Sequence, residues 1–150
     1  MSGVISYELF NSKLGTSGSG FTDLGGYFEI FINNTGTSVK GTIVVASTSV
    51  DDAVDIAPAN TYMPIGVIYE SGIANGNPVK VVVSGKAEAL LKDGEAASNG
   101  YWCGVSDVAG RMYQLLTVPS VPAHNREIGH SIQAVASGTD VLAKIQIHAN

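Results

Sequence analysis

Few side chains in this 150-residue sequence could do chemistry, and the three histidines are the first to consider. His124 and His130 are six residues apart around Gly129, and Glu127 lies between them, so these side chains could approach a metal ion. No two histidines have the i, i+4 spacing of a helical zinc site, and the glutamate that such a motif has between its two histidines is therefore missing as well. We therefore expect His124, His130 and His148 to be neutral surface or interface residues, with no metal site and no cofactor.

Nucleophiles and phosphate-binding loops give no stronger pattern. Residues 129–133 begin like the nucleophile elbow of a hydrolase but lack its closing glycine, and residues 15–20 lack the lysine of a phosphate loop. Cys103 is the single cysteine, so no disulfide can form within the chain, and we expect a buried structural thiol there. The sequence therefore predicts a protein without catalytic residues, not an enzyme.

The charged residues are sparse and scattered. Asp51, Asp52 and Asp55 form the densest acidic group, but they lack the spacing and the closing glutamate of a calcium loop. The net charge of −5 and the isolated lysines and arginines argue against a nucleic-acid partner. Apolar runs such as residues 81–83 are too short to cross a membrane, and no signal peptide is visible. We expect synthesis in a cytoplasm, with no membrane partner.

The elements that would position these residues are short apolar runs cut by glycine. Charged residues make up 14 % of the chain, against about 25 % in a typical globular protein, and there are 18 glycines. The runs are rich in β-branched and aromatic residues, which is typical of strands. They cover residues 27–32, 41–46, 65–69, 79–83, 87–91, 101–105, 111–115 and 141–148. This spacing predicts an all-β fold, a compact β-barrel or β-tulip-like sandwich.

Several local predictions follow from turn residues. The Asn-Asn-Thr-Gly sequence at 33–36 separates two strand-like runs and predicts a hairpin of residues 27–32 with 41–46. Residues 49–54 could form one helical turn capped by Ser49 or Asp51, and residues 131–136 fit either a helical turn or a strand. Alternation at the end of the chain places Ile145 and Ile147 on one side of a strand.

The first 26 residues differ from the rest of the chain. An apolar, strand-like segment is followed by a Gly/Ser-rich stretch at 14–20 with the composition of a flexible linker. We therefore divide the chain into an extended N-terminal arm with its linker, residues 1–26, and a single β-barrel domain, residues 27–150. The arm would dock on a partner by strand addition; the alternative is an ordinary first strand followed by a long loop. Its proposed contact residues are Val4, Ile5, Tyr7, Leu9 and Phe10.

Four segments carry a resemblance to a known family. Residues 85–91, with sequence GKAEALL, follow a valine-rich strand, and residues 65–68 resemble the strand that opens the same core. Residues 126–131, REIGHS, continue into the run from Val135 to Asn150. In these segments, over roughly residues 40–150, the chain resembles the capsid decoration, or cement, proteins of tailed bacteriophages.

The resemblance implies a structural protein of the virion, synthesised in the cytoplasm of a bacterial host, that binds the outside of the phage head. Such proteins are commonly trimers that staple neighbouring major capsid protein subunits and stabilise the expanded head. The implied partners are the major capsid protein and two further copies of this chain. Pro119, Val121 and Pro122 lie in a proline-bracketed loop that cannot join a β-ladder, so they are candidate subunit-interface residues.

The alternative function is a carbohydrate- or receptor-binding β-sandwich of a phage tail or virion surface. Aromatic rings stack on sugar faces, and Tyr62, Tyr69, Trp102 and Tyr113 could supply them. Core packing is the ordinary role of a tryptophan such as Trp102, so this alternative needs the rings to be exposed together.

Overall fold

A computed structural model describes residues 18–61, 63–115 and 126–148, and these residues form ten strands and no helix. No segment in those ranges is a helix that could span a membrane. The strands are β1 (Ser19–Phe21), β2 (Tyr27–Asn33), β3 (Ile43–Ala46), β4 (Ala53–Ile56), β5 (Gly66–Ile68), β6 (Pro78–Leu90), β7 (Trp102–Val105), β8 (Met112–Leu115), β9 (Glu127–Ser131) and β10 (Leu142–Ile147).

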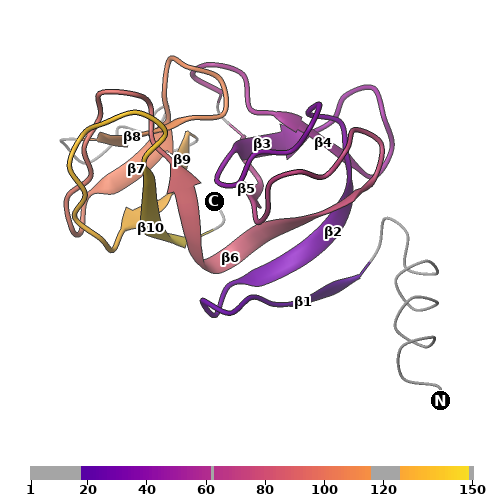
Figure 1. Cartoon of the computed structure of the whole chain (residues 1–150), viewed down its shortest axis with the longest axis horizontal. Coiled ribbons are helices and arrows are strands. Elements are labelled where there is room, and N and C mark those ends of the chain that lie inside the picture. The colour runs from indigo at the N-terminus through magenta and orange to yellow at the C-terminus, as the bar shows by residue number, and fades with distance from the viewer. Residues whose placement is uncertain (1–17, 62, 116–125, 149–150) are drawn as a thin grey trace.

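Five strands close into a barrel. The pairing runs β2–β4–β3–β5–β6, and β6 then pairs with β2 to complete the ring. The β2–β4 pair is parallel, through Ile32 opposite Ala53, and the other pairs are antiparallel. In Figure 1 these strands form the right-hand half of the molecule, with β1 along its lower edge. The prediction of an all-β fold built on a compact barrel is confirmed.

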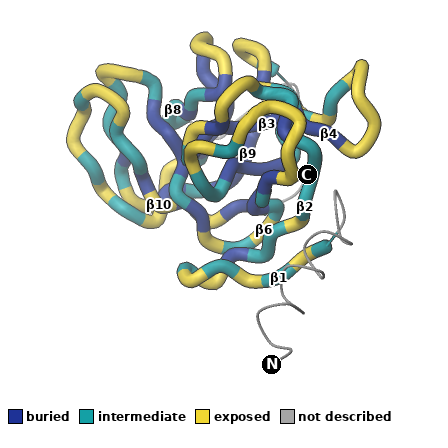
Figure 2. Tube along the Cα trace, turned by 45° about the vertical axis from the view of Figure 1, so that its right-hand side comes forward, coloured by how far each residue is buried: buried dark blue, intermediate teal, exposed yellow. Residues whose placement is uncertain are grey.

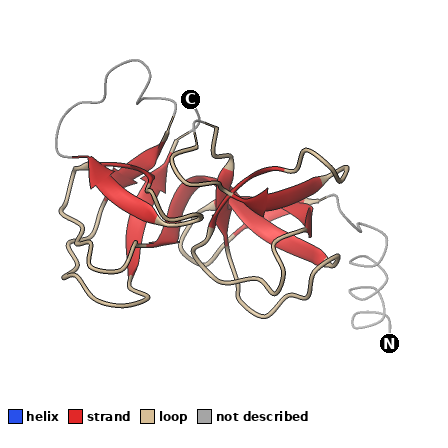
Figure 3. Cartoon of the chain, turned by 90° about the horizontal axis from the view of Figure 1, so that it is seen from above, coloured by secondary structure: helices blue, strands red, loops and turns tan. Residues whose placement is uncertain are grey.

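A second sheet grows from the far end of β6. Its order is β6–β10–β9–β7–β8. Strand β6 serves both units because it turns at Gly85, which has a φ of 80° that glycine adopts without steric cost. Residues before the turn pair with β2 and β5, whereas residues from Gly85 onward pair with β10. Figure 3 shows the two groups of strands side by side, joined by this long strand.

The second sheet curls back toward β6. Leu91, just beyond β6, forms a parallel bridge with Met112 of β8, and the Lys92 N–H donates to the Met112 carbonyl at 2.9 Å. Arg111 reinforces this closure, since its guanidinium donates to the Leu91 carbonyl at 3.1 Å and to Asp140 at 2.7 Å. The strand at the edge of the sheet is thereby held against the shared strand.

The buried hydrophobic residues form two clusters. One contains Val44, Val54, Ile68, Val79 and Val81, all from barrel strands. The larger cluster joins the two halves, because it combines barrel residues with residues of the second sheet. Its members include Ile43, Val67, Val82, Ala89, Cys103, Val105, Met112, Ile128, Ala143, Ile145 and Ile147. In Figure 2 the buried segments follow the strands, while the exposed ones lie mainly in the loops.

The predicted hairpin of residues 27–32 with 41–46 is wrong. Both segments are strands, β2 and β3, but β4 lies between them in the barrel. The turn residues serve another purpose, because the buried Asn33 side chain donates to the carbonyls of Gly36 and Ile73. Asn33 thus ties the end of β2 to the loop after β5, and a longer connection carries the chain to β3.

The helical turn considered for residues 49–54 does not form. Residues 49–52 are bend and turn, and β4 begins at Ala53. Pairing with β3 on one side and β2 on the other outweighs the weak local helical signal. Within the segment 1–26, the described residues include β1, which pairs with β2 through Gly20 opposite Phe28. The division of the chain at residue 26 stays a prediction.

Candidate functional site

Several residues singled out from the sequence lie outside the described residues. They are the arm residues Val4, Ile5, Tyr7, Leu9 and Phe10, the loop residues Pro119, Val121 and Pro122, and also Tyr62 and His124. The roles of these residues stay predictions.

Cys103 is a buried thiol, as expected. It lies on β7 with none of its surface exposed, and burial raises the pKa of the thiol to about 12. Because the thiolate is the reactive form, this cysteine is inert near neutral pH. The sulfur belongs to the larger hydrophobic cluster, so its role is packing.

Among the described residues, one group of three side chains could hold a metal ion, and it consists of Glu127, His130 and His148. The aspartates at 51, 52 and 55 are not part of such a group. Asp51 and Asp52 are exposed in the β3–β4 turn, while Asp55 accepts a hydrogen bond from Asn34 at 2.6 Å. Among the described residues, cation chemistry is therefore to be considered at the histidine group.

The fold brings these three side chains together from two neighbouring strands. Glu127 and His130 come from β9, and His148 directly follows β10, which pairs with β9. Gly129 allows the strands to approach closely, because a Cβ there would lie 2.0 Å from the Gln146 carbonyl oxygen. The His148 N–H also donates to the Ile128 carbonyl at 3.3 Å, which continues the pairing past the end of β10.

The geometry converges on one carboxylate oxygen. Glu127 Oε1 lies 2.5 Å from His148 Nε2 and 3.5 Å from His130 Nε2. The Glu127 side chain is fully buried, whereas the two imidazoles are 35 % and 36 % exposed. The site is thus a buried carboxylate against two partly exposed imidazole rings, with Glu127 Oε1 and His148 Nε2 themselves buried.

Trp102 closes one side of this group. Its ring lies 4.4 Å from the His130 ring and 6.4 Å from the His148 ring, measured between centroids. Trp102 is opposite His130 in the β7–β9 register, so the contact follows directly from strand pairing. The indole packs against the His130 imidazole with the two ring planes tilted by 45°.

The sequence spacing groups Glu127 and His130 with His124 and does not indicate that His148 lies beside them. The available signal was the alternation in the last strand. Ile145 and Ile147 are buried while Lys144 and Gln146 are exposed, as predicted, and continuing that alternation directs His148 outward. The missing information was the pairing of β10 with β9.

Three of the four aromatic residues suggested for sugar binding are described, and they are divided between the two units. Tyr69 follows β5 in the barrel, whereas Trp102 and Tyr113 lie on β7 and β8 of the second sheet. The Tyr69 hydroxyl donates to Asp23 at 2.9 Å, which raises the pKa of this tyrosine, and Lys80 lies over its ring. The Tyr69 side chain is thus already engaged in contacts with other residues of this chain.

The described surface carries several large apolar side chains. Phe21 on the edge strand β1 and Met63 in the β4–β5 connection are the most exposed, each at 77 %. The others are Val39, Val50, Ile56, Tyr101, Val108 and Ile132. Strand β1 pairs with β2 alone among the described strands, so its other edge offers backbone groups next to Phe21.

Comparison with known proteins gives one structural likeness to report. No protein-family model matches the chain, and no curated protein sequence matches it. Among solved structures, the fold is similar to that of the N base of head fiber protein gp8.5 of bacteriophage phi29. The TM-score is 0.57 at 15 % identity, and the match covers 81 % of this chain and 92 % of that one. At this identity the likeness concerns the fold.

Proposed function

We propose that this protein is a structural component of a tailed-bacteriophage head. The observation that carries the proposal is the fold shared with the base of a phage head fiber protein, over nearly the whole of that base. The resemblance of residues 40–150 to capsid decoration proteins points to the same class of virion protein. Fold alone does not define function, so the proposal also relies on the character of the surface.

The finer proposal is that the chain decorates the outside of the head and staples neighbouring major capsid protein subunits. Charged residues make up 14 % of the sequence, and large apolar side chains are exposed at eight described positions. Lysine and glutamate are depleted in protein interfaces, while apolar and aromatic residues are favoured in their centres. A surface of this kind is suited to contact with other subunits and needs no catalytic group.

The edge of β1 is the proposed point of attachment. Strand β1 lies within the predicted arm-and-linker segment, residues 1–26, and follows the proposed contact residues in the chain. The Phe21 ring on this strand packs against Tyr27, with ring centroids 5.7 Å apart. An arm that leaves an open sheet edge can add a strand to a neighbouring capsid subunit through main-chain hydrogen bonds. Many identical contacts on one head then reinforce each other, so each one can be modest.

Electron microscopy of heads tests the proposal at both levels. Particles from the phage that encodes this chain are compared with particles stripped of the protein or assembled without it. We expect the protein to co-purify with heads, and the stripped heads to lose density on their outer surface. Absence of the protein from purified virions would refute the head assignment, and its location in the tail would favour the receptor-binding alternative.

Two variants of equal exposure test the attachment point. Phe21→Ser alters the β1 edge, while Met63→Ser changes a side chain with the same 77 % exposure elsewhere. We expect Phe21→Ser to weaken rebinding to stripped heads at least tenfold and Met63→Ser to leave it unchanged. Deleting residues 1–14 should abolish rebinding while the circular dichroism of the barrel is retained. Full occupancy by the truncated protein would contradict the arm.

The proposed trimer is tested by mass measurement in solution. Size-exclusion chromatography with light scattering should give the mass of three 15.5-kDa chains, and a monomer on heads as well as in solution would contradict it. A glycan array with the isolated protein addresses the alternative function. Reproducible binding to one class of sugar, lost on substitution of Trp102 or Tyr113, would favour a carbohydrate-binding module.

A further inference from the structure

We propose that Glu127, His130 and His148 form a binding site for a late first-row divalent metal ion, with Zn²⁺ as the preferred ion. This inference is independent of the proposed function. No metal site was predicted from the sequence, because the third donor, His148, directly follows a strand whose pairing partner only the fold reveals. Nitrogen or oxygen donors from all three residues lie within 4.8 Å of one another.

The distances suit a small ion after modest adjustment. Zinc binds imidazole nitrogen and carboxylate oxygen at about 2.0–2.2 Å, so two tetrahedral ligands lie about 3.4 Å apart. Glu127 Oε1 is 2.5 Å from one imidazole nitrogen and 3.5 Å from the other, which brackets that separation. The two imidazole rings are each about one-third exposed, so small shifts of these rings bring the separations to that value, while the fully buried carboxylate stays in place.

The donor types select the class of ion. Two imidazoles and one carboxylate favour Zn²⁺, Cu²⁺, Ni²⁺ or Co²⁺, while Ca²⁺ and Mg²⁺ require six or more oxygen ligands. Three protein donors leave one tetrahedral position, which would take water. The proposal is for binding, and no reaction is assigned to this position.

Electrostatics and packing both favour a cation here. The Glu127 side chain is 0 % exposed, and a carboxylate removed from water is stabilised by positive charge close to it. His130 is braced by Trp102 at 4.4 Å, and the two imidazole rings are 5.0 Å apart. Preorganisation of this kind lowers the entropic cost of assembling three ligands.

The consequence for the protein is a cross-link at the end of its last strand. His148 directly follows β10, while Glu127 and His130 belong to β9. A bound ion would hold the end of β10 against β9, and a ligand that binds the folded state stabilises it by mass action. We therefore expect zinc to raise the unfolding temperature of the whole chain.

Trp102 provides the assay, because it is the only tryptophan in the sequence and touches the site. The full-length, tag-free protein is treated with EDTA, dialysed and titrated with Cu²⁺ or Co²⁺, which quench tryptophan fluorescence at short range. We expect saturable quenching with one ion per chain, reversed by Zn²⁺ and unaffected by millimolar Mg²⁺ or Ca²⁺. Absence of saturable quenching would overturn the proposal.

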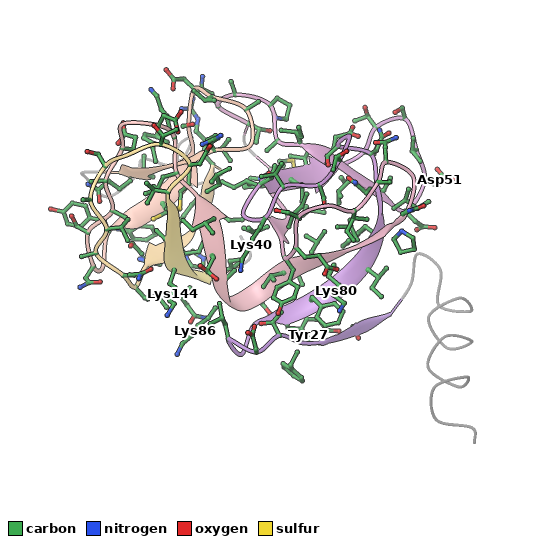
Figure 4. All side chains as sticks on the ribbon, in the orientation of Figure 1. Tyr27, Lys40, Asp51, Lys80, Lys86 and Lys144 are labelled. Atoms are coloured by element: carbon green, nitrogen blue, oxygen red, sulfur yellow. The ribbon has the colours of Figure 1, made fainter. Side chains whose placement is uncertain are left out.

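Variants separate a metal site from a simple imidazole–carboxylate contact. His148→Ala removes a partly exposed donor and should weaken Cu²⁺ and Zn²⁺ affinity at least tenfold. The matched control is Asp51→Asn, an exposed carboxylate at the opposite end of the molecule from Lys144 of β10 in Figure 4. Its affinity should stay within twofold of the original chain. Equal affinity of His148→Ala and the original chain would show that the contact is purely structural.

A second measurement keeps the test valid if a variant is destabilised. Thermal unfolding is followed by circular dichroism with and without Zn²⁺ for the original chain, His148→Ala and Glu127→Gln. We expect zinc to raise the unfolding temperature of the original chain and to leave both variants unchanged. If a variant is unfolded at the outset, the original chain and Asp51→Asn still test the proposal. The proposal fails if zinc raises the unfolding temperature of neither protein.

Discussion

Asn33 offers the sharpest test of how the barrel is held together. It is the last residue of β2 and has no exposed surface. Its amide nitrogen donates to the carbonyls of Gly36 at 2.7 Å and Ile73 at 2.9 Å. Its amide oxygen accepts from the N–H of Thr35 at 3.0 Å and from the Thr35 hydroxyl. The side chain therefore uses both its donors and its acceptor inside the protein.

The informative substitution is Asn33→Asp, which keeps the shape and replaces the donating nitrogen by an accepting oxygen. Two hydrogen bonds are lost, and the carbonyls of Gly36 and Ile73 face a negative oxygen in their place. Each unsatisfied buried polar group costs about 1–3 kcal/mol, so we expect a loss of about 3 kcal/mol in unfolding free energy at pH 7. For a chain of this length that lowers the unfolding temperature by about 6–12 °C.

The effect should depend on pH in a defined direction. The introduced carboxyl group is buried against carbonyl oxygens, so its pKa in the folded state is raised above the unfolded value of about 3.9. Protonation restores a donor, and the stability deficit relative to the original chain therefore shrinks as the pH falls toward 4. Above the folded-state pKa the full deficit is present.

Urea and thermal unfolding, followed by circular dichroism at pH 7 and pH 4, measure both effects. Asn99→Asp is the matched control, because Asn99 is exposed in the turn before Gly100. Its unfolding free energy should change by no more than about 0.5 kcal/mol. The reasoning is refuted if Asn33→Asp and the original chain have the same unfolding free energy at pH 7, or if Asn99→Asp loses as much stability as Asn33→Asp.

Four other outcomes are expected. Ile145 is fully buried in the larger hydrophobic cluster. In urea unfolding, Ile145→Ala should lower the unfolding free energy by about 2–5 kcal/mol, and Ile145→Val should lower it by about 1 kcal/mol. Gly129→Ala should lower the unfolding free energy by about 1–3 kcal/mol, because the added Cβ would clash with the Gln146 carbonyl. Gly104→Ala should lower it by less, because the atom closest to a Cβ there is 3.2 Å away. Arg111→Lys should cost about 1 kcal/mol in the same assay, because lysine cannot reach Asp93, Asp140 and the Leu91 carbonyl together. Cys103 should resist a thiol reagent at pH 8 in the folded protein and react once it is unfolded in urea, whereas reaction in the native state would contradict its burial.

Much of the secondary structure was predictable because strand formation has a local signal. The runs at 27–32, 65–69, 101–105 and 111–115 each coincide with a strand to within a residue or two. Glycine and asparagine mark the chain reversals between them through their tolerance of positive φ, as at Gly110 with a φ of 72°. The all-β class followed from these patterns without knowledge of any pairing.

Pairing was less predictable because it depends on distant residues. The Asn33–Gly36 segment has the composition of a hairpin turn, yet Asn33 bonds to Ile73, 40 residues away. Strand β4 has only four residues and a weak local signal, and it becomes a strand by pairing with β3 and β2. Neither interaction leaves a periodic mark in the sequence near the residues involved.

The candidate metal site shows the same division. The class of fold, the scarcity of charge, the burial of Cys103 and the outward direction of alternate residues in the last strand could all be read from the sequence. That His148 meets Glu127 and His130, with Trp102 beside them, depends on the tertiary structure. The physical reason is that alternation within a strand is set by backbone geometry, whereas proximity between strands is set by which sheet edges pair and in which register.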